Sequence, residues 1–288
     1  MAQNTTQHSL GFWELQPRPT KTELAEFYRQ KYFDSKNFEI QYDDEEFFHK
    51  QIPYMEAQFV AEEYLGPKSR RRVLDVGCGE GFSLYFFQQN GWEVEGTDYS
   101  HDGIRRHFPA LQDRVTVGDT EELLEQFAAA GKKYDLIVLN NVLEHLLEPL
   151  ETLKSLRQLI TDQGTVRAQV PNDFSSLQKR ALELKLIDRE FWVGPEHMSY
   201  FGRDSLKNAF QFCGFSRTEA LADYPIDFNL LNPDSNYIKD GSKGKNCHQE
   251  RIRLENLLAR QSVADLVAFR RGCGQASVGR NIIVYGRP

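Results

Sequence analysis

Three glycines at alternate positions, Gly77, Gly79 and Gly81, stand between an apolar run that ends at Val76 and a stretch typical of a helix. Glycine tolerates positive φ angles and lets a ligand approach the backbone closely, and the start of a helix offers N–H groups to a carboxylate. The motif therefore predicts a small-molecule site at a strand–helix turn. Position 82 is Phe82, which excludes the GxGxxG spacing of a dinucleotide site, and no GxxxxGKS/T phosphate loop occurs in the sequence.

Acidic and polar residues end each of the next three predicted strands. Asp98 lies 21 positions after Gly77, where a carboxylate can accept hydrogen bonds from both hydroxyls of a ribose. Asp119 and Asn140 end the third and fourth strands. Any one acid of this kind can be a simple helix cap. Because ligands bind at the carboxyl ends of parallel strands, the series as a whole favours one shared pocket.

Apolar and amphipathic segments alternate from residue 72 onward, which predicts an α/β fold with a mostly parallel sheet and helices on both faces. Strands are expected at 72–77, 93–98, 114–118, 134–139, 164–170, 215–222 and 281–285, and helices at 82–90, 101–108, 121–130, 148–160, 174–187 and 204–213.

The chain divides into a helical N-terminal cap (1–66), a ligand-binding core (67–222) and a C-terminal part (223–288). In the cap, helices are expected at 20–29, with Thr20 and Glu23 as a capping box, and at 44–64. The C-terminal part is expected to hold a long loop to residue 246, one helix of about twenty residues from His248, and a closing strand.

The segment 75–81, an acid followed by GxGxG, resembles motif I of the class I S-adenosylmethionine-dependent methyltransferases. Segment 140–145 (NNVLEH) resembles the LEH segment of the small-molecule branch, which includes quinone-biosynthesis O-methyltransferases. The resemblance implies a Rossmann-like fold with a seven-stranded sheet, an antiparallel last strand at 281–286, S-adenosylmethionine as cofactor and S-adenosylhomocysteine as product. The cofactor contacts that it implies are Asp75, Gly77, Cys78, Gly79, Gly81, Phe82, Asp98, Tyr99, Asp119, Thr120 and Asn140, with the adenine near Asp119 and Thr120.

Two histidines are candidates for a general base, because a hydroxyl acceptor must lose its proton as it takes up a methyl group. His197 lies in the insertion after the fifth strand, and His145 follows the fourth strand, so both are expected at the cofactor edge. His197 can instead be a structural residue that bonds a backbone carbonyl. His145 can instead shape the wall beneath the methyl group.

The PEHxxYF pattern at 195–201, completed by Ser205 and Leu206, resembles bacterial methyltransferases that modify glycans and secondary metabolites. It implies O-methylation of a sugar hydroxyl, on a nucleotide-sugar or at a glycan end. The alternatives are a quinone or phenolic acceptor, whose hydroxyl is more acidic, and a cofactor-binding subunit without catalysis. The insertion 188–203, with one Gly194-Pro195 step between aromatic flanks, suits a lid that excludes water.

The 288 residues include 35 Lys and Arg against 42 Asp and Glu, a formal net charge of −7. An acidic chain is a poor binder of nucleic acid, because phosphate neutralisation dominates that affinity. The four cysteines form no CxxC pair, so we expect reduced thiols and no metal site. No apolar run reaches the ~20 residues of a membrane span and no secretory signal pattern is present, which predicts a cytoplasmic protein. The late insertion 223–280 is interpreted as an acceptor-binding part or a subunit contact, such as that of a homodimer.

Overall fold

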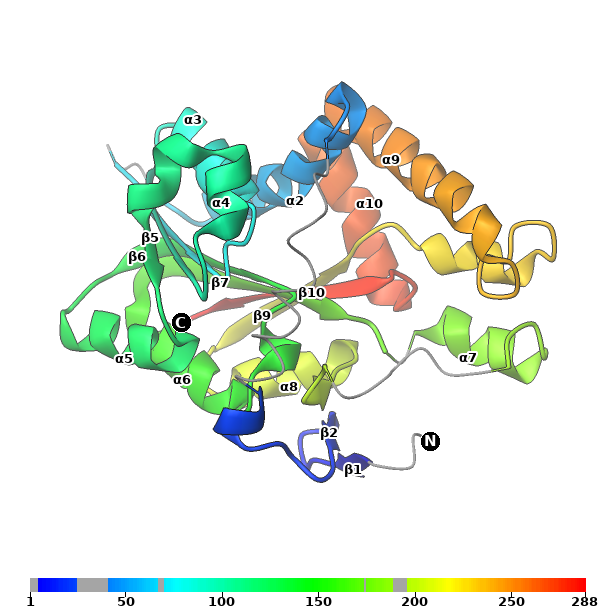
Figure 1. The fold of residues 1–288 in the computed structure, drawn as a ribbon, viewed down its shortest axis with the longest axis horizontal. Coiled ribbons are helices and arrows are strands. Elements are labelled where there is room, and N and C mark those ends of the chain that lie inside the picture. The colour runs from blue at the N-terminus through cyan, green and yellow to red at the C-terminus, as the bar shows by residue number, and fades with distance from the viewer. Residues whose placement is uncertain (1–4, 25–40, 67–69, 174, 189–195) are drawn as a thin grey trace.

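A computed structural model describes residues 5–24, 41–66, 70–173, 175–188 and 196–288 of the chain (Figure 1). At its centre is a seven-stranded sheet in the order β5-β4-β3-β6-β7-β10-β9. The pairs from β5 to β7 are parallel, whereas β10 pairs antiparallel with both β7 and β9. The strands are β3 (Arg72–Val76), β4 (Glu93–Asp98), β5 (Val115–Val117), β6 (Tyr134–Asn140), β7 (Ile160–Pro171), β9 (Arg217–Ala222) and β10 (Asn281–Arg287). The predicted seven-stranded, mostly parallel sheet is confirmed.

Helices cover both faces of this sheet (Figure 1). One face packs against α5 (Thr120–Ala129), α6 (Pro149–Leu159) and α8 (Arg203–Phe212). The other packs against α2 (Asp44–Glu62), α3 (Phe82–Gln89) and α10 (Val263–Ala276). A strand covered on both faces must be apolar on both, and the central strands are accordingly continuous apolar runs. Consecutive side chains are fully buried, as shown by Val73 and Leu74 in β3 and by Leu136 and Ile137 in β6. The shorter α4 (Asp102–His107) and η2 (Pro109–Arg114) connect β4 to β5.

The N-terminal segment is not purely helical, which corrects the sequence-based expectation for residues 1–66. The strands β1 (Thr5–Gln7) and β2 (Trp13–Leu15) form a hairpin, and β2 pairs antiparallel with β8 (Ser199–Tyr200) in a second, three-stranded sheet. Three-residue strands are too short for a recognisable alternation of apolar and polar residues, and the partner strand lies far along the sequence. For these two reasons, the local sequence pattern does not predict the hairpin.

The helix expected after Thr20 begins as predicted. The Thr20 hydroxyl accepts from Glu23 N at 3.2 Å, and the Glu23 carboxylate accepts from Thr20 N at 2.8 Å. The expected continuation of this helix to Arg29 lies outside the described residues. The second expected helix is α2, whose first turn is capped by Asp43.

The C-terminal part contains two long helices where the sequence predicted one. Helix α9 (Gly244–Gln261) ends directly before Ser262, and α10 begins directly after Ser262. The Ser262 side chain accepts from Asp265 N at 3.3 Å and so caps the new helix. The short helices η4 (Ile226–Leu231) and η5 (Gly241–Lys243) lie within the expected long loop, whereas α7 (Ser176–Glu183) belongs to the core and precedes β8. Within the described ranges, no helix combines the length and apolarity needed to cross a bilayer.

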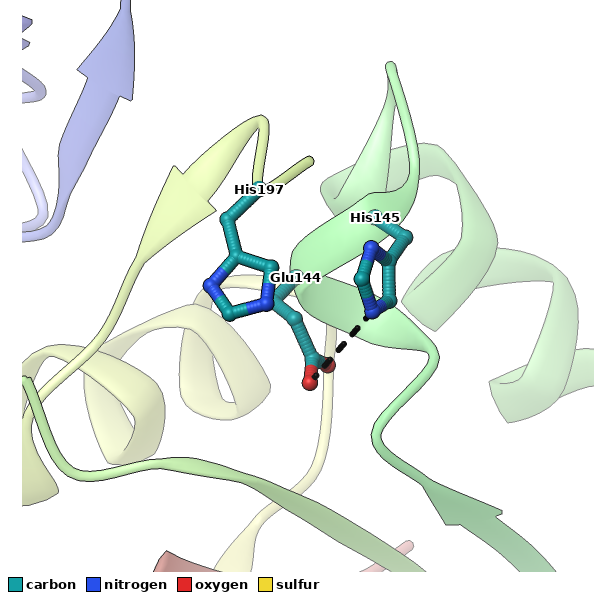
Figure 2. A group of neighbouring side chains, drawn as sticks. All are labelled: Glu144, His145 and His197. Atoms are coloured by element: carbon teal, nitrogen blue, oxygen red, sulfur yellow. Dashed lines mark ion pairs between the residues drawn. The ribbon is translucent and has the colours of Figure 1, made fainter. Parts of the chain in front are cut away.

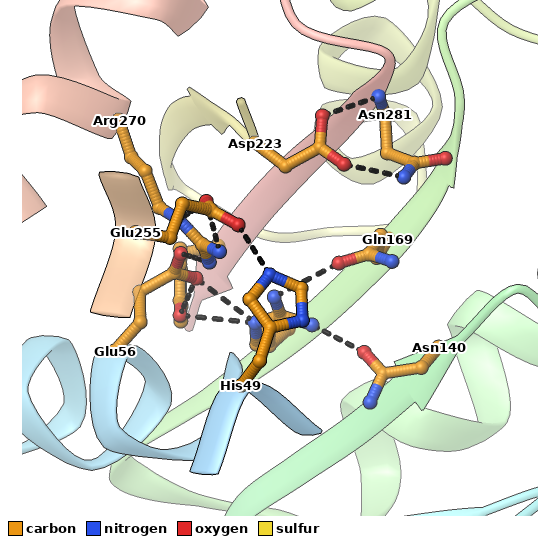
Figure 3. A network of polar contacts seen from close by, with 10 residues as sticks. His49, Glu56, Asn140, Gln169, Asp223, Glu255, Arg270 and Asn281 are labelled. Atoms are coloured by element: carbon orange, nitrogen blue, oxygen red, sulfur yellow. Dashed lines mark hydrogen bonds and ion pairs between the residues drawn. The ribbon is translucent and has the colours of Figure 1, made fainter. Parts of the chain in front are cut away.

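A buried ion network holds α2, α9 and α10 against the sheet (Figure 3). Glu56 of α2 accepts from Arg167 Nε at 3.1 Å and from Nη1 of Arg270. Arg270 Nε also donates to Glu255 Oε1 at 3.0 Å, and His49 Nε2 lies 2.9 Å from the other oxygen of that carboxylate. Burial alone would raise the pKa of Glu56, but the two guanidinium charges hold it below its usual value.

The same network reaches the carboxyl end of β6 through Arg167. Its Nη2 donates to Gln169 Oε1 at 3.1 Å, and its Nη1 donates to Asn140 Oδ1. Figure 3 shows Asn140 and Gln169 side by side at this end of the network. The N-terminal helix and the C-terminal helices are therefore coupled to the edge of the sheet at which the predicted site residues lie.

Candidate active site

The glycine motif forms the turn between β3 and α3. Gly77, Gly79 and Gly81 have φ angles of 71°, 52° and 83°, which glycine adopts without strain. A Cβ added to Gly77 would lie 2.6 Å from Val142 Cγ2, whereas a Cβ added to Gly79 would meet no described heavy atom within 4 Å. Packing therefore requires a glycine at 77, and the space beside Gly79 is open to a ligand.

Backbone donors of the turn are partly used by the protein itself. The N–H groups of Gly77 and Cys78 donate to Thr97 O at 2.9 and 3.0 Å, and Gly79 N donates to Asp98 Oδ2 at 2.8 Å. At this turn a ligand would thus exploit the open space beside Gly79 rather than these three donors.

Asp98 ends β4 beside the glycine turn and is 8% exposed. One carboxylate oxygen accepts from Gly79 N, and the other accepts from Ser100 N at 3.1 Å. Because a carboxylate offers about four acceptor positions, this arrangement is compatible with further donors such as ribose hydroxyls. Asp98 thus fixes the turn, and its role in binding a ribose stays a prediction.

Replacement of Asp98 by alanine is expected to weaken S-adenosylhomocysteine binding by about 1.5–3 kcal/mol, because hydrogen bonds to a charged acceptor are lost. Isothermal titration calorimetry measures this loss, and Asp98→Asn, which keeps one carbonyl oxygen, is expected to lose less. An affinity of Asp98→Ala equal to that of the wild type would place the ligand elsewhere.

Gly79→Val is expected to weaken the same binding more than Asp98→Ala does, because the side chain would occupy the open space at the turn. A matched control is Gly91→Val, since Gly91 also has a positive φ, of 79°, and no described atom within 4 Å of an added Cβ. Both variants carry the backbone strain of a β-branched residue at positive φ. We therefore expect similar losses of melting temperature but a loss of affinity only in Gly79→Val. Equal affinities in the two variants would contradict the assignment of the turn.

Asp119 and Tyr99 lie together at the next strand ends. Asp119 caps α5 by accepting from Glu122 N at 3.1 Å, and its second oxygen accepts from the Tyr99 hydroxyl at 3.2 Å. Tyr99 is 49% exposed, whereas Thr120, the first residue of α5, is buried. The cap alone accounts for an acid at position 119. The exposed ring of Tyr99 is the part of this pair that a flat ligand can contact.

Three predicted cofactor residues have buried side chains. Burial, together with the smaller effect of the nearby Asp98 charge, raises the pKa of Asp75 to about 7. The Cys78 thiol is buried, and Phe82 packs edge-to-face against Phe108 with ring centroids 5.1 Å apart. Contacts of Cys78 or Phe82 with a cofactor would therefore come mainly from their backbone atoms.

Asn140 is held at the end of β6 from both sides. Its Oδ1 accepts from Arg167, and its Nδ2 donates to the Tyr54 hydroxyl at 3.4 Å. The amide is thereby fixed in one orientation at the carboxyl edge.

Glu144, His145 and His197 come together next to this edge (Figure 2). The short helix η3 (Leu143–His145) follows β6 and carries the first two, whereas His197 lies just before β8. The imidazole rings of His145 and His197 meet edge to face, with centroids 4.7 Å apart and an interplanar angle of 79°, and His145 Nε2 lies 3.9 Å from Glu144 Oε1. The structure thus brings both predicted histidines to one place and adds Glu144, which the sequence reasoning had not singled out.

Two backbone contacts fix the segment that carries His197. Glu196 O accepts from His145 Nδ1 at 2.7 Å, and Met198 N donates to Glu144 O at 2.7 Å. Met198 O in turn accepts from Leu15 N at 3.0 Å, so the N-terminal hairpin helps to position His197. Residues 189–195 of the predicted lid, with its Gly194-Pro195 step, lie outside the described residues.

Comparison with known proteins agrees with this geometry. A family model described as a methyltransferase domain matches residues 47–220, which is more than half of the chain. Among solved structures, an S-adenosylmethionine-dependent methyltransferase from Archaeoglobus fulgidus has a TM-score of 0.51 at 19% identity, covering 83% of this chain and 94% of that one. At this identity the likeness concerns the fold.

Two curated relatives carry the name ubiquinone biosynthesis O-methyltransferase. The protein from Cereibacter sphaeroides is 33% identical over 96 residues, which are 32% of this chain and only 38% of that protein. The one from Saccharophagus degradans is 24% identical over 187 residues, which are 61% of this chain and 78% of that protein. Neither name refers to a glycan, so the resemblance to glycan-modifying enzymes stays a prediction. The match over 47–220 shows that the chain belongs to the methyltransferase-domain family, and it has the Rossmann-like fold of S-adenosylmethionine-dependent methyltransferases.

Proposed function

We propose that the chain transfers the methyl group of S-adenosylmethionine to a hydroxyl oxygen of a small molecule. The observation that carries this proposal is the His145–His197 pair, which stands at the same sheet edge as the open glycine turn. Imidazole is the side chain whose ordinary pKa best suits proton abstraction near neutral pH.

The cofactor would lie over the turn between β3 and α3, with its ribose at Asp98 and its adenine near Tyr99 and Asp119. The acceptor oxygen forms a bond to the methyl carbon while the carbon–sulfur bond breaks and its electron pair stays on sulfur. The hydroxyl proton passes to an imidazole, and the neutral thioether leaves as S-adenosylhomocysteine. Alignment of oxygen, carbon and sulfur supplies much of the rate in such a displacement.

A sugar hydroxyl is our first candidate acceptor. It is a weak acid, so its methylation needs a general base, and the histidine pair can supply one. A quinone-type or phenolic hydroxyl is the second candidate. It is favoured by the names of the two relatives, although the first of them is matched over only 38% of its length. A phenol, with a pKa of about 10, needs less assistance from a base.

The test is transfer of a labelled methyl group from S-adenosylmethionine to two acceptor panels, one of nucleotide-sugars and free sugars and one of catechols and hydroxyquinols. Label in a methyl ether, with an equal amount of S-adenosylhomocysteine, is the expected result. A fractionated extract of the native host extends the panels to acceptors of unknown structure. Label found only on amines or proteins would contradict the proposal.

A further inference from the structure

Glu144, His145 and His197 have the composition of a metal-ligand set. One ligand atom from each of the three lies within 4.8 Å of the others, and no second group of this kind occurs among the described residues. The sequence did not predict this set, because its third member lies in a distant segment that β2 and the backbone of Glu144 hold in place.

The Glu144 carboxylate lies where a cation would be expected. The side chain is 1% exposed, and neither of its oxygens accepts a hydrogen bond from another of the described residues. Figure 2 shows both imidazoles beside it. An ionised carboxylate in such surroundings requires a positive partner.

His145 is oriented as metal-binding histidines are. A carbonyl oxygen can only accept, so the 2.7 Å contact with Glu196 O requires a proton on Nδ1, and the other ring nitrogen, Nε2, lies 3.9 Å from Glu144 Oε1. A hydrogen bond from the second ring nitrogen to a carbonyl is the usual arrangement that fixes the tautomer of a metal ligand.

We propose that Glu144, His145 and His197 bind one divalent transition-metal ion. Two imidazoles and one carboxylate suit Zn²⁺ or a similar ion better than Mg²⁺, which prefers oxygen ligands. Metal–ligand distances of about 2.0–2.2 Å require the ligand atoms to lie within about 4.4 Å of one another. Both histidines are only partly buried, so small side-chain rotations can supply this closure.

Three protein ligands leave positions open on such an ion, as in catalytic zinc sites. If the proposed methyl transfer is right, an open position would take the acceptor hydroxyl, and the ion would lower the pKa of that hydroxyl. The imidazoles would then act as ligands, and the proton would leave to water.

The test uses the full chain after treatment with EDTA and dialysis into chelator-free buffer, with Zn²⁺ alone as the titrant in calorimetry. We expect about one Zn²⁺ per chain at micromolar strength or tighter, and at least about tenfold weaker binding in His197→Ala and in Glu144→Gln. His197 is partly buried at the end of a loop, so its truncation is compatible with folding, which circular dichroism verifies. The control is His248→Gln, which removes one ring of the other histidine pair, His49 and His248, whose centroids are 6.3 Å apart.

Zinc binding that is absent in the wild type, or equally strong in wild type and His197→Ala, would overturn the metal site. Binding of S-adenosylhomocysteine is measured on the same samples and involves none of the three ligands. A failure of that binding would reject the proposed function, whatever the zinc titration shows.

Discussion

Alanine in place of His197 is expected to lower kcat by about 10²–10⁴-fold, while the affinity for S-adenosylhomocysteine stays close to that of the wild type. In the proposed function the ring serves the acceptor side of the site, where it lies next to Glu144 and its ring contacts are with His145 and Tyr200. Its removal takes away a proton acceptor or a metal ligand without changing the cofactor contacts. Initial rates at saturating acceptor, together with calorimetry of the product, measure the two quantities separately.

The paired variant is His145→Ala, measured under the same conditions. His145 also donates to Glu196 O at 2.7 Å, so its loss is expected to lower kcat and to loosen the segment that carries His197. An essential His145 beside a dispensable His197 would reverse the two roles. Full activity in both variants would mean that the acceptor is already ionised, which favours the phenolic acceptor over the sugar.

Glu56→Ala is expected to lower the free energy of unfolding by about 3–5 kcal/mol, because it leaves two buried guanidinium groups without their shared carboxylate. Arg167 is fully buried, Arg270 is 2% exposed, and both donate to Glu56. Equilibrium unfolding in urea measures the change. Because Arg167 also holds Asn140, we expect weaker cofactor binding in the folded fraction.

The matched control is Glu63→Ala, which breaks the ion pair between Glu63 and Arg271 at 2.7 Å. Both of these side chains are about one third exposed, so the expected cost is only about 0–1 kcal/mol. A loss in Glu56→Ala no larger than in Glu63→Ala would show that the buried network is not what holds α2 and α10 on the sheet.

The parts of the fold that the sequence predicted correctly are those with a local signal. The apolar runs 73–76 and 134–139 are buried on both faces, and the capping box at Thr20 and Glu23 is formed as expected. The sequence did not predict the hairpin of β1 and β2. These strands form a three-stranded sheet with β8, and the pairing of β2 with β8 joins segments that are far apart in the sequence.

In the candidate site, too, the sequence predicted the residues that have a local signal and missed those that long-range contacts bring together. The glycine turn and Asp98 are consecutive strand ends and could be found by spacing. Nothing in the sequence distinguishes Glu144, a buried carboxylate that accepts no hydrogen bond from the described residues, from an exposed helix cap. The ion network is likewise invisible, because Glu56, Arg167 and Arg270 come from three distant segments.

The most direct test of the cofactor assignment is a calorimetric titration of S-adenosylhomocysteine into the wild-type chain, with thermal unfolding at saturation as a second readout. The open turn at Gly79 and the carboxylate of Asp98 predict a single site of micromolar Kd. At a ligand concentration 100-fold above Kd, the folded state gains about 2.7 kcal/mol, which raises the melting temperature. The absence of both binding heat and a shift in melting temperature at millimolar ligand would contradict the assignment.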